Sequence, residues 1–346
     1  MIAPETGVFR TTYLADLTLH RVPFARQAII AFLLFMLLGV PLIASDYQVY
    51  VIDTMLIACI GAIGLNLLTG YAGQISIGQG AFMGVGAFVS AMLSSRLGVP
   101  FWLSVPAGGI VAGVVGLAFG LPSVRIRGLY LAISTLAAQV IVEWVLSRPG
   151  LVGGGSVSAP RPALLDSDRA YYFLLLAVCV GAVLYAENLL RTRIGRALVA
   201  IRDHDIAASV IGIDVPRYKL LAFGVSSSYA GLAGALLGFL GRTVNVEQFQ
   251  LDLSIQYLAM IVIGGLGSIP GAIFGAVFIT LLPIVLRSVM GVFGDVLPGN
   301  PAVVLSSAQF FLFGLVIVVF MTVESHGLAR IWRNVKDYVR LWPFSY

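Results

Sequence analysis

The densest group of ionisable side chains lies in the segment RTRIGRALVAIRDHDIAASVIGI, from Arg191 to Ile213. Its arginines, aspartates and single histidine alternate with small residues, and long apolar stretches flank it on both sides. A turn between two membrane helices needs only a few residues, whereas this segment is long enough for a short helix and a turn. We therefore expect the segment to have a role besides the connection of two helices.

The residue patterns of several enzyme and channel classes are absent from the sequence. Neither of the two lysines, Lys219 and Lys336, ends a P-loop motif, so the chain does not bind and hydrolyse ATP in that way. The three histidines show no metal-ligand spacing, and no G-x-S-x-G motif occurs. Cys59 and Cys179 both lie in apolar stretches, where packing is the expected role. The TVGYG motif of a potassium filter and the regular arginines of a voltage sensor are also missing.

Polar residues inside apolar stretches are costly and therefore point to function. Asp53 and Glu143 fall near the ends of such stretches, and we expect their carboxylates to reach water there. Polar residues among the glycines of residues 70–86 are better candidates for a solute pathway, because glycines expose backbone amides and carbonyls to a polar solute. The alternative, that these small polar residues hold helices together, stays open. The candidates for the pathway are Asn66, Gly73, Gln74, Ser76, Gln79, Gly80, Gly265, Gly267 and Ser268.

The composition places these residues in a membrane protein. Hydrophobic residues make up 59% of the 346 residues, and charged residues make up only 11%. Soluble domains carry roughly 25% charged residues, so this chain lacks the polar surface that a soluble protein needs. Crossing a bilayer takes about 20 apolar residues per helix. We therefore expect an all-α, polytopic transmembrane helical bundle. The net charge of +5 is explained by cytoplasmic anchoring of loops and termini, without nucleic acid as a partner.

Windows without charges predict about ten spans. They are residues 27–45, 50–69, 75–95, 101–122, 128–147, 171–190, 220–241, 254–268, 271–289 and 303–323. Both termini are expected in the cytoplasm, because that orientation leaves only six of the 21 basic residues outside. The six are Arg96, Arg148, Arg161, Arg169, Arg242 and Arg287. Eight spans with additional re-entrant segments fit the same distribution of basic residues.

The predicted order of regions follows from these spans. Residues 1–26 form a retained cytoplasmic arm, residues 27–323 form the transmembrane domain, and residues 324–346 form a cytoplasmic tail. The tail alternates apolar and basic residues at helical spacing and predicts an amphipathic helix at the membrane surface. The sequences GAFMG at residue 80 and GAIFG at residue 271 share a G-A-x-x-G pattern. This pattern fits either a transporter repeat or ordinary small-residue helix packing, and packing is the expectation.

Three segments resemble the permeases of branched-chain amino acid importers of the ATP-binding-cassette class. LNLLTGYAGQISIGQGAF (65–82) is similar to the glycine-rich signature of that family, and VIGGLGSIPGAIFGA (262–276) is similar to its late glycine-rich hairpin. GRALVAIRDHDIAASVIGIDV (195–215) resembles the cytoplasmic loop that docks on the ATPase subunit. The resemblance covers most of residues 50–325 in the same order, and it is strongest to the LivM-type members.

The resemblance implies a permease subunit of a bacterial inner membrane that has no catalysis of its own. It also implies the partners: a shorter LivH-type permease in a heterodimer, two ATP-binding subunits and a periplasmic solute-binding protein. ATP and Mg²⁺ belong to the ATP-binding subunits, and this chain holds no cofactor or metal. The implied coupling loop is residues 191–219. Its implied coupling residues are Gly195, Arg196, Ala197, Ala200, Arg202, Asp203, Asp205, Ala207, Ala208 and Gly212.

The coupling loop fits a docking role on physical grounds. Small residues allow close approach of a partner, and the spacing i, i+3, i+7 places Arg202, Asp205 and Ser209 on one helical stripe. His204 departs from the family, which more often has an acidic or amide residue there. The loop at residues 150–160 matches the family only loosely. The solute therefore stays open between branched-chain amino acids, urea, short amides and aromatic carboxylates.

Two other classes of transporter remain as alternatives. An ion-coupled secondary transporter would use Asp53 or Glu143 to carry protons or sodium. A passive channel would conduct a small neutral solute such as urea in both directions. Uptake into vesicles distinguishes the importer from the ion-coupled transporter and the channel, because only the importer needs ATP and partner subunits.

Overall fold

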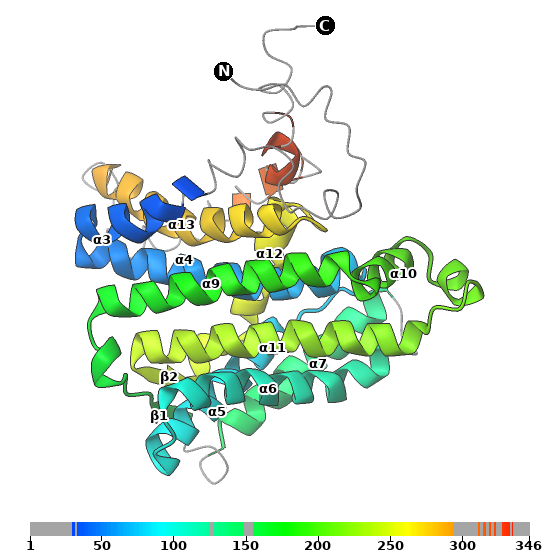
Figure 1. Ribbon diagram of the computed structural model, residues 1–346, viewed down its shortest axis with the longest axis horizontal. Helices are drawn as coiled ribbons and strands as arrows, with labels where there is room; N and C mark the ends of the chain where they lie inside the picture. The colour runs from blue at the N-terminus through cyan, green and yellow to red at the C-terminus, as the bar shows by residue number, and fades with distance from the viewer. Residues whose placement is uncertain are drawn as a thin grey trace, which may run out of the picture.

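Long apolar helices form most of the computed structural model, which describes residues 30–31, 33–124, 128–148 and 155–293. It also describes residues 311, 314, 315, 318, 319, 322, 327–332 and 334. The helices α9 and α11 lie side by side along the bundle, with α10 at one end and the β1–β2 pair at the other (Figure 1). The predicted arm and most of the predicted tail and tenth span lie outside the described residues.

The helices of the described residues have the following bounds. They are α3 (Val40–Ile43), α4 (Asp46–Asn66), α5 (Gln79–Leu97), α6 (Phe101–Gly120), α7 (Leu129–Leu146), α9 (Asp168–Arg191), α10 (Arg193–Val210), α11 (Val215–Gly241), α12 (Leu251–Gly264) and α13 (Ile269–Phe293). The strands β1 (Ser156–Ser158) and β2 (Thr243–Asn245) pair antiparallel, with Val157 opposite Val244. A π-helical turn, Leu67–Tyr71, extends α4.

Among the described residues, five helices are long and apolar enough to cross a bilayer, which agrees with an all-α membrane bundle. They are α4 with its π-helical extension, α5, α6, α9 and α11. α7 and α13 contain shorter apolar stretches, Tyr130–Leu146 and Ile269–Val285. The third predicted span begins too early: residues 74–78 are not helical, and α5 starts at Gln79. The side chain of Gln79 donates to the carbonyl oxygen of Gly61 in the second half of α4, so α5 starts inside the bundle.

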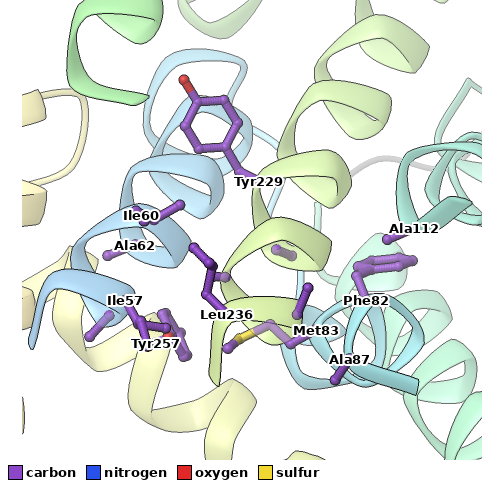
Figure 2. Close-up of a cluster of buried hydrophobic side chains, with 14 of the residues drawn as sticks. Ile57, Ile60, Ala62, Phe82, Met83, Ala87, Ala112, Tyr229, Leu236 and Tyr257 are labelled. Carbon is purple, nitrogen blue, oxygen red and sulfur yellow. The ribbon is translucent and has the colours of Figure 1, made fainter. Parts of the chain in front are cut away.

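Small residues let the central helices α5, α6 and α11 approach one another closely. A Cβ atom added at Gly86 of α5 would collide with the backbone of Gly231 in α11, and one added at Gly231 would collide with Ala112 of α6. Larger apolar side chains fill the space around these contacts (Figure 2), where Ile60, Phe82, Met83 and Leu236 are buried. A core with such close backbone contacts tolerates added volume poorly.

The two G-A-x-x-G sequences share one structural role, which is packing on α12 and the turn before it. A Cβ added at Gly80 would lie 2.9 Å from the carbonyl oxygen of Phe249, and one added at Gly84 would lie 3.2 Å from the Phe249 Cβ. Gly271 and Gly275 of α13 meet the backbone of the later part of α12, at Gly264 and Met260. The pattern therefore serves close helix packing, as expected for small residues.

A buried arginine fixes the end of the bundle that carries β1 and β2. Arg161 donates hydrogen bonds to the carbonyl oxygens of Phe239 (2.8 Å) and Leu240 (2.6 Å), and it pairs with Asp168 at 2.7 Å. Its guanidinium carbon also lies 4.6 Å from the ring centre of Tyr171. One side chain thus joins the loop before α9 to the start of α9 and the end of α11. Of the six arginines predicted outside, this one is a buried structural residue.

Candidate functional site

The starts of α5 and α12 meet inside the bundle, where α7 joins them through one glutamine. The N–H of Gly80 donates to Ser254 Oγ (2.7 Å), and the N–H of Ala81 donates to Gln139 Oε1 (2.6 Å). Gln139 Nε2 donates to the carbonyl oxygen of Phe249 (2.7 Å), and Ser254 Oγ donates to Gln139 Oε1 (3.1 Å). We call Gly80, Ala81, Gln139, Phe249 and Ser254 the inner junction. It satisfies helix-start N–H groups that have no partner within their own helix.

The inner junction brings two positive helix ends together in an apolar environment. The first N–H groups of a helix carry a partial positive charge, and broken membrane helices that meet in this way often line solute sites. Gly80 and Gln79 are predicted pathway candidates, and Gln79 Nε2 donates to the carbonyl oxygen of Gly61 (3.0 Å). Ser254 and Thr135 were not among the predicted pathway residues. The Thr135 hydroxyl accepts a hydrogen bond from the N–H of Ile77 (2.9 Å). A lone hydroxyl in an apolar helix gives no sequence signal that separates such a role from simple packing.

A second polar contact joins the end of α4 to the loop between α12 and α13. The N–H of Gly267 donates to Asn66 Oδ1 (3.0 Å), and Asn66 Nδ2 donates to the carbonyl oxygen of Ser268 (2.8 Å). Gly267 has a left-handed φ of 75°, which glycine adopts without strain. Three pathway candidates, Asn66, Gly267 and Ser268, thus belong to one hydrogen-bonded clasp. We call these residues the loop clasp.

Arg202 of α10 reaches the same place from the predicted coupling loop. Its Nη1 donates to the carbonyl oxygen of Gly70 (2.7 Å), in the π-helical turn that follows α4. A Cβ added at Gly73 would lie 3.2 Å from Arg202 Cγ, and one added at Gly267 would lie 2.6 Å from Arg202 Nη1. Arg202 therefore contacts both loops that the loop clasp connects.

The helix α10 is bent at His204. That residue has φ of −160° and ψ of 99°, which are extended values inside an otherwise helical segment. The predicted stripe of Arg202, Asp205 and Ser209 is therefore wrong, because the helical spacing is interrupted between the first residue and the other two. After the bend, Ile206, Val210 and Ile211 are exposed.

The predicted coupling residues differ in their exposure. Gly195, Ala197 and Ala208 are buried, and a Cβ added at Gly195 would collide with the backbone of Leu190 at the end of α9. Ala200 and Asp205 are half-buried. The exposed members are Arg196, Arg202, Asp203, Ala207 and Gly212. The buried small residues hold α10 against the bundle, so they are placed to support a contact surface rather than to form it.

A cavity of about 300 Å³ lies between the bend of α10 and the bundle. Its lining includes Gln74, His204, Asp205 and Lys219. Lys219 Nζ lies 3.7 Å from Asp205 Oδ2, and both side chains are largely buried. The amide group of the pathway candidate Gln74 is buried without a hydrogen-bond partner among the described residues.

The remaining pathway candidates lie between these sites. Ser76 is buried, and its hydroxyl accepts from the N–H of Gly78 (3.3 Å). Gly265 ends α12 with φ of 114°, and Gly73 has φ of 68°. The candidates thus lie at the inner junction, at the loop clasp and in the segments that connect them.

The predicted placement of Asp53 at the water interface is wrong. Its side chain is fully buried, and neither carboxylate oxygen has a hydrogen-bond partner among the described residues. Asp53 lies one turn after Val49, which packs in a cluster with Tyr172 of α9, so this face of α4 points to α9. Glu143 is half-buried in α7. Among the described residues, no group of three or more His, Cys, Asp or Glu side chains could hold a metal ion.

Comparisons with known proteins cover the part of the chain that contains these sites. Residues 48–321 match the profile of a family described as the permease component of branched-chain amino acid transport systems. The chain is similar to the high-affinity branched-chain amino acid transport permease LivM of Salmonella typhimurium (32% identity, 70% of this chain, 64% of the relative). It is also similar to LivM of Escherichia coli (31% identity, 74% and 66%) and to LivH of Salmonella typhimurium (27% identity, 63% and 78%). The matches to the two LivM proteins span slightly less than two thirds of their length. No solved structure matches the chain.

Proposed function

The chain belongs to the permease family of branched-chain amino acid transport systems, and from this membership we propose that it is a permease subunit of an ATP-binding-cassette importer. The profile match over residues 48–321 carries the proposal, since it includes the inner junction, the loop clasp and α10. We propose branched-chain amino acids as the solute because the relatives that match are named for their transport. In this function the subunit moves solute and performs no chemical reaction.

The subunit works with partners that supply solute and energy. We propose a heterodimer with a LivH-type permease, since relatives of both names match this chain. Two ATP-binding subunits with ATP and Mg²⁺ would supply energy, because the sequence contains no P-loop. A periplasmic binding protein would deliver the solute to a bacterial inner membrane. About ten spans, with both termini in the cytoplasm, agree with the distribution of arginines and lysines.

We place the contact with the ATP-binding subunit at the bend and second half of α10. Ile206, Val210 and Ile211 are 58%, 81% and 73% exposed there. α10 lies at the end of the long helices (Figure 1), which would be outside the hydrocarbon core. Exposed apolar side chains outside the membrane are typical of a surface that a partner covers. We call these three residues the α10 apolar surface.

We place the solute pathway beside the inner junction. Two positive helix ends favour the carboxylate of an amino acid there. An importer must open this region to one side of the membrane at a time, and ATP can drive that change only through contacts that differ between the two states. α10 is the element that connects the ATP-binding subunit to the helices involved.

Reconstituted uptake tests the proposal. Proteoliposomes that contain the permease pair, the ATP-binding subunits and the binding protein should accumulate leucine, isoleucine or valine only with ATP. Uptake that is driven by an ion gradient without ATP would show an ion-coupled carrier instead. Asp53→Asn adds a second comparison between the two classes. An ion-coupled carrier that uses the buried carboxylate would lose uptake in this variant, whereas the importer would retain it. Flux in both directions without a binding protein would show a channel.

A further inference from the structure

Arg202 connects α10 to two loops that are far apart in the sequence. Its Nη1 bonds to the carbonyl oxygen of Gly70 at 2.7 Å, in the loop that leads to α5. A Cβ atom added at Gly267, in the loop that follows α12, would lie 2.6 Å from the same nitrogen. The side chain is 44% exposed, so part of it still reaches solvent.

Both loops lead to the inner junction. Residues 71–78 run from the Gly70 turn to the start of α5, where Gly80 bonds to Ser254. Gly267 follows α12, a helix of 14 residues whose other end carries Ser254. A displacement at Gly70 and Gly267 therefore reaches the inner junction by two routes, through the 71–78 segment and along α12.

Three glycines leave room for the Arg202 side chain, which also borders the cavity at the bend of α10. Gly70, Gly73 and Gly267 lie around it, and the last two have left-handed φ values of 68° and 75°. A side chain at any of these glycines would meet another group: Asn66 and the Gly267 nitrogen at position 70, and Arg202 at positions 73 and 267. The absence of side chains at these glycines therefore lets the Arg202 side chain lie between the two loops.

We infer that Arg202 is a positioning residue for transport, which transmits movement of α10 to the starts of α5 and α12 and does not itself contact the ATP-binding subunit. This inference rests on the proposed function. A guanidinium group suits the task because it donates several hydrogen bonds in a fixed geometry and stays charged. A hydrogen bond from a charged donor to a backbone carbonyl is stronger than a neutral one and keeps the two elements together.

Arg202→Ala in the complete transporter tests the inference. We expect the variant to retain bound ATP-binding subunits and ATP hydrolysis, while solute transported per ATP falls about tenfold or more. Arg202→Lys, which keeps one charged donor, should recover part of the loss. Arg193→Ala is the matched control: Arg193 is an exposed arginine at the start of the same helix, and its removal should leave solute per ATP unchanged.

A glycine pair gives a second measurement if Arg202→Ala does not fold. Gly267→Ala should lower solute per ATP by displacing the guanidinium group. Gly98→Ala introduces the same kind of backbone strain, at φ of 64°, where an added Cβ has no neighbour within 4 Å. It should leave solute per ATP unchanged, so a difference between the two variants reports the contacts at position 267, where an added Cβ would meet Arg202 Nη1 (2.6 Å) and the Gly70 carbonyl oxygen (3.2 Å).

Two results would overturn the inference. Loss of the ATP-binding subunits from the purified Arg202→Ala complex would make Arg202 a docking residue. Unchanged solute per ATP in both Arg202→Ala and Gly267→Ala would leave Arg202 without a role in transmission. A wild-type complex without ATP-dependent uptake would overturn the proposed function instead, and this result is seen before any variant is compared.

Discussion

The side chain of Asn66 holds the backbone of Gly267 from 201 positions away, with 3.0 Å between Asn66 Oδ1 and the Gly267 nitrogen. The same amide donates to the carbonyl oxygen of Ser268 at 2.8 Å. One side chain therefore satisfies a donor and an acceptor in a loop between two helices. An amide does both through two separate atoms, whereas an ionised carboxylate accepts and cannot donate.

Asn66→Ala and Asn66→Asp should both destabilise the protein. Alanine removes two partly buried hydrogen bonds, at a cost of up to about 1–3 kcal/mol for each group left without a partner. Aspartate keeps the bond from Gly267 but places a carboxylate beside the Ser268 carbonyl oxygen. The measurement is the thermal midpoint of the purified protein in detergent. Thr54→Ala is the control, since Thr54 bonds only to a carbonyl of its own helix, and equal midpoints for Asn66→Ala and Thr54→Ala would contradict this role.

Ser254→Ala should lower both stability and uptake. The substitution leaves the N–H of Gly80 without its acceptor at the start of α5, at a cost of about 1–3 kcal/mol. Ser90→Ala is a closely matched control, because Ser90 is also buried but its hydroxyl donates to Ala87 within its own helix. Thermal midpoint and uptake rate are measured for both variants. The inner junction would have no special role if the two serines gave the same result.

Gly86→Ala should reduce the yield of folded protein. The added methyl group would collide with the backbone of Gly231, which no rotamer change can relieve. Gly181→Ala in α9 should not reduce the yield of folded protein. The added Cβ has no neighbour within 4 Å, and alanine is more favourable than glycine in a helix by about 1 kcal/mol. Size-exclusion profiles of fluorescent fusions measure the folded fraction. A monodisperse Gly86→Ala protein at wild-type yield would contradict the close contact of α5 and α11.

Much of the fold could be predicted from hydrophobic stretches, because a membrane helix leaves a long apolar run in the sequence. The start of α5 could not, since residues 75–78 are as apolar and glycine-rich as the helix that follows. Their non-helical course depends on contacts with other helices, such as the bond from Ile77 to Thr135.

The site was predicted in part. The glycines and amides at positions 66–80 and 265–268 were selected from the sequence, and the structure places them at the inner junction, at the loop clasp and between them. Their distribution among these places depends on which distant helices meet, and so do the roles of Gln139 and Ser254. The bend at His204 also has no sequence signal, because neither glycine nor proline marks it.

The α10 apolar surface leads to the last prediction. Val210→Asp and Ile211→Asp should each weaken binding of the ATP-binding subunits about tenfold or more, because a charge would be placed in an apolar contact without a partner. Both side chains are exposed in this chain, so neither substitution should disturb its fold. Leu164→Asp is the control: Leu164 is 83% exposed in the short 3₁₀ turn Ala163–Leu165, before α9 and therefore at the opposite end of that helix from α10. Titration of purified ATP-binding subunits against the permease pair in nanodiscs gives the dissociation constants. Wild-type affinity in both Val210→Asp and Ile211→Asp would move the docking contact away from the second half of α10.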